Sequence, residues 1–230
     1  MAVQSNLSDT LFARGGAAWL LVSLFLTLIL VPFIENIPQS HIVLDGAISM
    51  VTATVVIAIW KRNLLRTPLV GLALVLIPVT WVSLFVKSTG LFVAHCLFAS
   101  VFFWLSGALV LVLSIRHRFT SIDSVFGAIS AYLLFGLGWA FMYWAIYTAV
   151  PDSFNWPAQA VLEDPGGRTV GIFSDLIYYS MVTMSTLGYG DVTPIGKVAR
   201  TLSWMQSVTG QFYVAVVIAW LVSALPRNLE

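Results

Sequence analysis

The stretch Thr-Leu-Gly-Tyr-Gly-Asp at residues 186–191 decides the fold of this 230-residue chain. Gly188 and Gly190 make positive φ angles available at little steric cost, so the backbone can turn successive carbonyls toward one axis. A row of carbonyl oxygens that faces one axis can replace the water around a cation. Thr186 can add its hydroxyl oxygen at the inner end. Asp191 lies at the outer end, where a carboxylate attracts cations.

A short segment before this string, about Ser174–Ser185, fits the same picture. It is apolar on one side, rich in Ser and Thr, and too short to span a membrane, so we expect a helix that enters the membrane halfway. Ser174 or Asp175 could cap its first turn. Irregular backbone at membrane depth is tolerated only where it lines a watery cavity. Pro194 then favours the start of a further helix.

The order of long helix, short helix, Thr-Leu-Gly-Tyr-Gly string and long helix over about 122–225 resembles the pore module of the tetrameric potassium channel family. The string differs from the Thr-Val-Gly-Tyr-Gly filter of that family only by Leu187. The resemblance implies a selectivity filter for K⁺ as the permeant ion, with no other cofactor. Because a closed ring of carbonyls needs four loops and the chain has one, a homotetramer with cyclic symmetry is expected. The implied filter residues are Thr186, Leu187, Gly188, Tyr189 and Gly190, with K⁺ at the first four.

Two tyrosines before the filter stand where many family members carry two Trp residues. The resemblance therefore implies that Tyr178, Tyr179 and Asp191 form the bracing and the mouth of the filter. We expect the Tyr179 hydroxyl to donate a hydrogen bond to the Asp191 carboxylate, in place of an indole N–H.

The composition agrees with a membrane protein. Hydrophobic residues make up 59% of the chain, charged residues make up 9%, and the mean hydropathy is +0.93, values that exclude an ordinary soluble domain. The net charge of +1 and the lack of a basic run give no indication of a nucleic-acid partner. We predict an all-α membrane protein of six transmembrane helices plus the re-entrant pore helix, in contact with lipid. The six apolar runs are about Ala17–Ile34, Ile42–Trp60, Pro68–Phe85, Leu91–Ile115, Ile122–Ala149 and Gly196–Leu225.

These runs divide the chain into three expected segments. We expect residues 1–16 to form a cytoplasmic N-terminal segment and residues 17–120 to form a four-helix voltage-sensor-like domain. Residues 121–230 are expected to form the pore domain, which consists of an outer helix, turret, pore helix, filter and inner helix. A voltage sensor needs a series of Arg or Lys on its fourth helix. The run Leu91–Ile115 contains neither residue, so steep voltage gating is not expected. His95 within it is interpreted as a packing histidine rather than a pH sensor.

The distribution of Lys and Arg predicts the orientation of the chain. Lys61, Arg62 and Arg66 lie between the second and third runs, and Arg116 and Arg118 lie between the fourth and fifth. Both loops fall on one side, which we therefore expect to be cytoplasmic, with both termini inside and the filter facing out. The compact chain, with no soluble regulatory domain expected after the last run, indicates a prokaryotic plasma membrane.

The last apolar run is expected to line the cavity and the inner gate. Gly210 is either a hinge, as the resemblance implies, or a small residue for close helix packing, and the sequence favours neither. A spacing of four places Val214, Ile218 and Val222 on the same helix face. A ring of four apolar side chains at one level can close a pore by dewetting.

The preferred interpretation is a potassium-selective channel that conducts K⁺ passively. Two alternatives stay open: a weakly selective cation channel, against which the intact Tyr189 argues, and a non-conducting membrane scaffold subunit that keeps the pore fold. The sequence has no paired nucleophile and His, no metal-ligand spacing and no phosphate loop, so an enzyme is not expected. It does not specify the gating stimulus or any regulation by lipid or a partner.

Overall fold

The computed structural model describes residues 4–34, 40–60, 66–86, 88–116, 122–150, 152–156, 162–163 and 169–224. Within these ranges the chain is almost entirely helical, which together with its apolar helices confirms the predicted all-α membrane protein. The helices are α1 Gln4–Ile34, α2 Ser40–Trp60, α3 Arg66–Phe85, α4 Thr89–Arg116, α5 Ile122–Ala149, α6 Ile172–Met184 and α7 Lys197–Ala224. The strands have two residues each: β1 Phe154–Asn155, β2 Leu162–Glu163, β3 Thr169–Val170 and β4 Thr193–Pro194.

The predicted apolar runs coincide with α1 to α5 and α7, and the short predicted helix coincides with α6. The largest difference is at the N-terminus, where α1 begins at Gln4 rather than Ala17. The helix therefore continues through most of residues 1–16, whose cytoplasmic location stays a prediction.

Among the residues that the structure describes, three helical stretches are long and apolar enough to cross a membrane: Gly16–Ile34, Thr89–Ile115 and Asp123–Ala149. Ile42–Ala58 of α2 and Leu69–Val82 of α3 are apolar but shorter. The described part of α7 is not among the three candidates, because polar residues recur along its first half. The count of six spans therefore stays a prediction.

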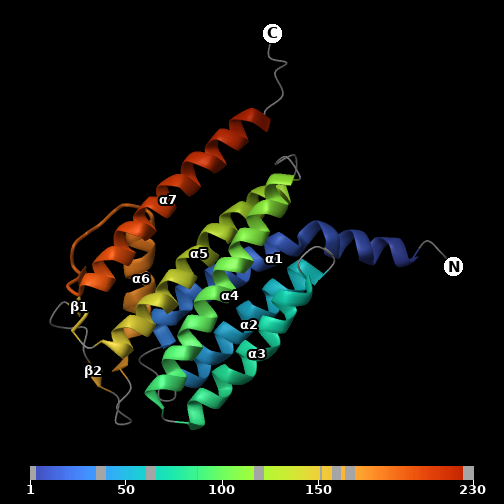
Figure 1. Ribbon diagram of the computed structural model, residues 1–230. Coiled ribbons are helices and arrows are strands. Elements are labelled where there is room, and N and C mark those ends of the chain that lie inside the picture. Colours follow the sequence, from blue (N-terminus) through green and yellow to red (C-terminus); the bar gives the residue numbers. More distant parts are fainter. Residues whose placement is uncertain are drawn as a thin grey trace.

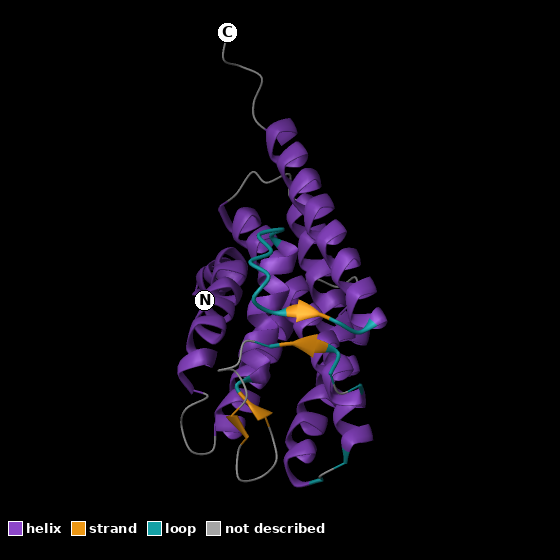
Figure 2. Cartoon of the chain, turned by 90° about the vertical axis from the view of Figure 1, so that its left-hand side faces the viewer, coloured by secondary structure: helices purple, strands orange, loops and turns teal. Residues whose placement is uncertain are grey.

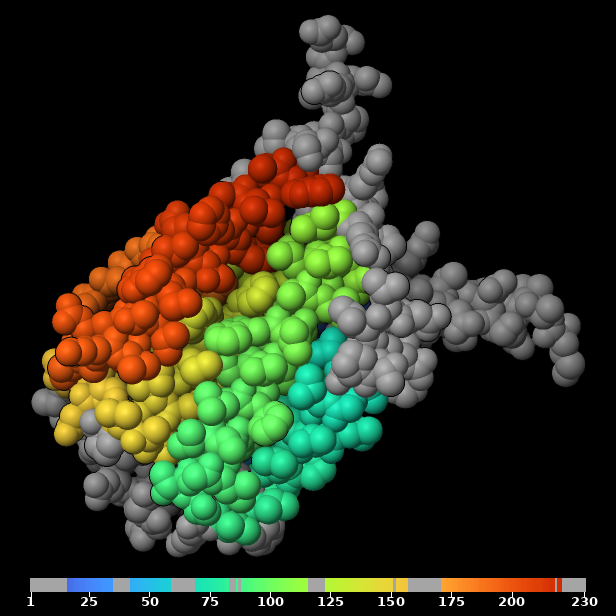
Figure 3. Space-filling model, viewed as in Figure 1, coloured from blue at the N-terminus to red at the C-terminus, as the bar shows by residue number. Residues whose placement is uncertain are grey.

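Close packing of small residues joins α4 to α5, which lie side by side (Figure 1). A Cβ on Gly127 would meet Ser114 Oγ at 2.3 Å, and one on Gly138 would meet the Trp104 ring at 2.4 Å. Small residues let helix backbones approach closely, as is common in membranes. The pair occupies the middle of the bundle, with α7 at one edge and α3 at the other (Figure 1, Figure 3).

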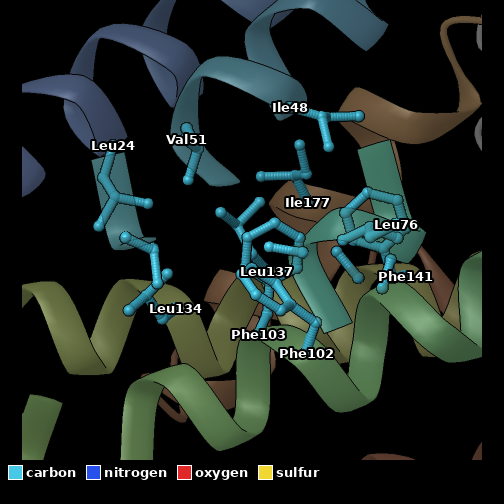
Figure 4. Packing of buried hydrophobic residues seen from close by; sticks show 14 of the residues in the cluster. Leu24, Ile48, Val51, Leu76, Phe102, Phe103, Leu134, Leu137, Phe141 and Ile177 are labelled. Atoms are coloured by element: carbon cyan, nitrogen blue, oxygen red, sulfur yellow. The ribbon is translucent and has the colours of Figure 1, made fainter. Parts of the chain in front are cut away.

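One hydrophobic core joins α1 to α6, and its side chains point toward one another (Figure 4). The core includes residues from both sides of position 120, so packing is continuous across the expected boundary between the two larger segments. The helices of the expected pore segment thus pack directly against the N-terminal helices. The labelled core residues are Leu24, Ile48, Val51, Leu76, Phe102, Phe103, Leu134, Leu137, Phe141 and Ile177.

His95 of α4 lies in this packed region. Its Nε2 is 2.9 Å from Thr80 Oγ1 of α3, and the side chain is buried. Its ring contacts Phe92 and Phe141 edge-on. These contacts support the interpretation of His95 as a packing residue.

Two short strand pairs lie close to each other (Figure 2), at the end of the bundle where β1 and β2 are labelled in Figure 1. β1 pairs antiparallel with β4, and β2 pairs antiparallel with β3. The N–H groups of Ile195 and Gly196 also donate to the Ser153 carbonyl, at 2.8 and 3.1 Å. The segment that leaves the 186–191 string is therefore tied to the segment that follows α5.

Candidate ion-conduction site

The 186–191 string forms an exposed loop between α6 and β4, outside the three candidate spans. The backbone φ is positive at Thr186 (60°), Gly188 (56°) and Gly190 (81°), and it is not positive at Leu187 or Tyr189. Residues of positive φ and residues without it thus alternate along the loop. Such alternation turns successive peptide groups to the same side, which an extended strand does not do. This alternation of φ agrees with the row of carbonyl ligands that the sequence predicts, and the ligand role itself stays a prediction.

The sequence predicted positive φ at the two glycines but not at Thr186. Threonine is β-branched, and a β-branched residue is strained in the left-handed region of backbone conformation. The residue type at position 186 therefore gave no reason to expect a positive φ there. Hydrogen bonds hold it in place: Thr186 N–H donates to the Thr183 carbonyl at 3.1 Å, and Thr186 Oγ1 donates to the Ser185 carbonyl at 2.7 Å. Gln211 Nε2 of α7 also donates to Thr186 Oγ1, at 3.2 Å.

A hydrogen bond closes the outer end of the loop onto α6. Tyr178 Oη donates to Asp191 Oδ2 at 2.6 Å, and the Val192 N–H donates to Asp191 Oδ1 at 3.0 Å. The Tyr178 ring also stacks on Tyr189, with centroids 6.4 Å apart and planes 5° from parallel. Tyr178 thus touches the loop at two of its residues.

The predicted bond between Tyr179 and Asp191 is wrong. Tyr179 Oη instead lies 2.5 Å from Ser203 Oγ of α7, and the Tyr179 ring packs against Tyr143 and Phe154. Consecutive helix residues point about 100° apart, since a turn has about 3.6 residues. Tyr178 therefore faces the loop, whereas Tyr179 faces α5 and α7.

The pKa values of the ionisable groups Asp175, Tyr178 and Asp191 are shifted in part by interactions among these groups. The hydrogen bond from Tyr178 lowers the pKa of the Asp191 carboxyl, and the same bond raises the pKa of Tyr178 to about 12. Burial, and then the charge of Asp191, raises the pKa of Asp175. Asp191 is consequently ionised and Tyr178 protonated at neutral pH, which is the pairing that the hydrogen bond requires.

The first turn of α6 differs from the prediction. The helix begins after its N-cap residue Gly171 (φ 102°), which has no side chain that could accept a capping hydrogen bond. Ser174 and Asp175 lie inside the first turn, and Ser174 Oγ donates to the Gly171 carbonyl at 3.0 Å. Their predicted capping role is wrong because the helix starts earlier than Ser174. Asp175 still lies where the helix dipole favours a negative charge.

Comparison with known proteins identifies the family. A family model described as ion channel matches residues 90–227, more than half of the 230-residue chain. The chain belongs to the ion-channel family. The matched residues include nearly all of α4 to α7 and the whole loop.

Three curated proteins resemble this ion-channel family member over part of its length. Protein LctB of Bacillus caldotenax is 32% identical over 109 residues, which are 44% of this chain and 72% of the relative. Protein LctB of Geobacillus stearothermophilus is 29% identical over 102 residues, with the same coverage of 44% and 72%. The inward rectifier potassium channel Kirbac3.1 of Paramagnetospirillum magnetotacticum is 35% identical over 57 residues, 25% of this chain and 19% of the relative. No solved structure matches the chain. The predicted family membership is confirmed as far as the ion-channel family, and potassium as the permeant ion stays a prediction.

Gly210 of this channel protein lies against the end of α6. A Cβ at Gly210 would lie 2.0 Å from the Met184 carbonyl oxygen and 2.9 Å from the Met184 carbonyl carbon. No other residue type fits this space without movement of backbone, so close packing accounts for the glycine. A hinge at Gly210 stays a prediction.

The predicted gate is described only in part. Val214 is 45% exposed on α7. Ile218 and Val222 belong to α7 by sequence position, but their side chains lie outside the described residues.

A buried polar cluster that the sequence analysis missed lies between α5, α6 and α7. Gln206 is fully buried and bonds both Tyr143 and Ser180. Gln206 and Gln211 are the two glutamines of an otherwise largely apolar run. A polar residue within a membrane helix is itself a signal of function, which could have singled them out.

Proposed function

We propose that four copies of this chain form a potassium-selective channel. The four loops surround a common axis, and the carbonyl oxygens of residues 186–189, with the Thr186 hydroxyl, bind K⁺ in place of water. The alternation of φ at Thr186, Gly188 and Gly190 is the observation that carries this proposal. The short match to an inward rectifier potassium channel supports K⁺ as the permeant ion.

The exposed surface of α7 supports assembly into a homotetramer. Trp204, Val208, Phe212 and Val216 recur at a spacing of four and form an apolar stripe. Trp204 is 59% exposed and Phe212 is 66% exposed. One chain leaves both this stripe and the filter loop uncovered, and α7 lies at an edge of the bundle (Figure 3). Copies arranged around an axis, together with lipid, would cover both.

The acidic groups near the loop suit the mouth of a cation pore. Asp191 and Asp175 lie on the side where α6 begins and the loop ends. Negative charge at a pore entrance raises the local concentration of cations. We propose that this end faces the outside of a plasma membrane, with both termini cytoplasmic. The basic loops that predict this orientation contain residues outside the described ranges, including Lys61, Arg62 and Arg118.

The interior end of the proposed pore lies along the second half of α7. The exposed Val214 would narrow the cavity with its three symmetry copies, and Ile218 and Val222 are proposed to narrow it further. An apolar ring at this level would close the pore without a soluble gating domain.

Potassium flux through the purified protein in liposomes tests the proposal. K⁺ efflux that Ba²⁺ blocks and that is lost when Na⁺ replaces K⁺ is the expected result. Equal rates for K⁺ and Na⁺ would indicate a weakly selective cation channel. An absence of flux at every voltage and pH would favour a non-conducting scaffold. The mass of the detergent-solubilised complex is the accompanying measurement, and a value other than four chains would contradict the tetramer.

A further inference from the structure

A hydrogen-bonded cluster is buried between the three helices α5, α6 and α7. It contains Tyr143 of α5, Ser180 of α6 and Gln206 of α7, each with 0% of its surface exposed, and it ends on the backbone of Gly136. Two of these helices also contact the loop at residues 186–191: α6 through Thr183 and Tyr178, and α7 through Gln211. Buried polar groups between membrane helices need a complete set of partners, because lipid and apolar side chains offer none.

Every polar group of the Gln206 amide has a partner. Gln206 Oε1 accepts from Tyr143 Oη at 2.6 Å, and Nε2 donates to the Ser180 carbonyl at 2.9 Å and to Ser180 Oγ at 2.7 Å. Ser180 Oγ in turn donates to the Gly136 carbonyl at 2.7 Å. With the amide reversed, its oxygen would face the Ser180 carbonyl, so the network allows one orientation only.

The cluster also fixes the register of α6 against α7. Gln206 contacts Ser180, and Gly210, one turn later, packs against Met184, one turn after Ser180. The two helices therefore meet at two successive turns with the same offset. Gly210 supplies a close approach, whereas Gln206 supplies directional bonds that a shifted or rotated α6 could not make.

The position of α6 against α7 also determines the position of the loop, because the loop is bonded to both helices. Thr186 N–H donates to the Thr183 carbonyl, and Gln211 of α7 donates to Thr186 Oγ1. A small movement of α6 along α7 would thus displace Thr186, the residue in the most strained backbone conformation of the loop.

We propose that Gln206 is a positioning residue, which locks α6 to α7 and so holds the 186–191 loop in its ion-binding geometry. The ion-binding part of this inference rests on the proposed function. Single hydrogen bonds between membrane helices contribute little to stability on average, so a role in geometry accounts better for a complete network. Gln206 acts through Ser180 and the end of α6, without contact to an ion.

Amide hydrogen exchange of the purified, reconstituted protein tests the positioning role. Gln206→Leu removes the bonds to Ser180 and leaves the Tyr143 hydroxyl without its acceptor. We expect amides of residues 181–191 to exchange about tenfold faster than in the wild type, with residues 89–149 unchanged. Thr201→Val is the matched control on α7, because the bond of Thr201 Oγ1 within the described part of the chain is to the Lys197 carbonyl of its own helix, at 2.9 Å. Unchanged exchange at 181–191, or a uniform increase along the chain, would overturn the proposal.

A double variant keeps the test valid if Gln206→Leu does not assemble. Gln206→Leu with Tyr143→Phe leaves no unpaired phenol, and Ser180 Oγ keeps its bond to the Gly136 carbonyl. The double variant should therefore recover thermal stability while residues 181–191 still exchange faster. Recovery of both together would overturn the positioning role and leave a purely structural one.

The ratio of K⁺ to Na⁺ flux in liposomes provides a functional readout. At matched thermal stability, the double variant should lose selectivity while the Thr201→Val control keeps it. A selective wild type with an equally selective double variant would contradict the inference. A wild type without K⁺ flux would contradict the proposed function instead, and the exchange experiment would still decide whether Gln206 positions the loop.

Discussion

Tyr178 and Asp191 lie at opposite ends of the segment that carries the candidate filter, and a 2.6 Å hydrogen bond from Tyr178 Oη to Asp191 Oδ2 joins them. The loop is thereby fixed at both ends, since its first residues continue directly from the last turn of α6. The stacking of Tyr178 on Tyr189 adds a second contact on the outer side. Tyr178 therefore braces the loop at both Asp191 and Tyr189.

Tyr178→Phe should weaken the outer end of the loop. The substitution removes the hydrogen bond to Asp191 but keeps the ring that stacks on Tyr189. We expect K⁺ flux to decline faster during sustained conduction than in the wild type. Tyr179→Phe is the matched control, because Tyr179 bonds Ser203 rather than Asp191. A time course altered by the Tyr179 substitution and unaffected by the Tyr178 substitution would contradict this assignment.

The bond between Tyr178 and Asp191 should have a defined pH range. The hydrogen bond from Tyr178 lowers the pKa of Asp191 in the folded protein. The stabilisation of the folded loop by ionised Asp191 is therefore complete above the ordinary pKa of about 3.9, and it is lost as the pH falls through the folded value. The pKa of Tyr178 is raised to about 12. The stabilisation of the folded loop by the protonated Tyr178 hydroxyl is therefore complete below the ordinary pKa of about 10, and it is lost as the pH rises through about 12. Flux measured against external pH should therefore be stable between about 4 and 10. In Tyr178→Phe the acid limit should move to higher pH, and an unmoved limit would show that this bond does not set it.

Gly188→Ala should disrupt the loop through its backbone. A Cβ at Gly188 meets nothing within 4 Å in the single chain, so the cost arises from its φ of 56°, about 1–2 kcal/mol for a left-handed residue with a side chain. We expect loss of K⁺ selectivity with the helices retained in circular dichroism. Gly71→Ala is the control, because its space is equally open and it lies in α3, where alanine stabilises a helix by up to about 1 kcal/mol. Similar effects of both variants on selectivity would argue against the loop geometry.

Gly210→Ala distinguishes packing from a hinge. Its Cβ would lie 2.0 Å from the Met184 carbonyl oxygen, and overpacking of this kind costs about 1–3 kcal/mol. The packing interpretation predicts a lower melting temperature and impaired assembly. Gly46→Ala in α2, where a Cβ meets nothing within 4 Å, should leave both unchanged. A Gly210→Ala protein of normal stability with altered opening would instead favour the hinge.

Voltage should have little effect on opening. The segment Leu91–Ile115 of α4 carries no Arg or Lys, so no series of charges can move through the membrane field. α4 is also packed along its length against α5 (Figure 1), which opposes independent movement. Open probability measured at both signs of voltage should therefore change gradually. A steep sigmoidal dependence would contradict this expectation.

Features that depend on residue type were accessible from the sequence, whereas features that depend on helix rotation were not. Gly188 and Gly190 signal positive φ by themselves, and the apolar runs signal α1 to α5. The sequence predicted Tyr179 as the donor to Asp191, whereas the donor is its neighbour Tyr178. The two side chains point about 100° apart on the helix, and the sequence alone does not specify which of them faces the loop. The positive φ of Thr186 and the buried bonds of Gln206 were not predicted. Both involve contacts between segments distant in the chain, which no local sequence pattern specifies.

The reversal potential under bi-ionic conditions tests the central claim most directly. The purified protein would be placed in a planar bilayer with equal concentrations of K⁺ on one side and Na⁺ on the other. The loop geometry predicts a reversal potential far from zero, with the sign set by the K⁺ gradient, and block by Ba²⁺. A reversal potential near zero would contradict potassium selectivity, and an absence of current would contradict conduction itself.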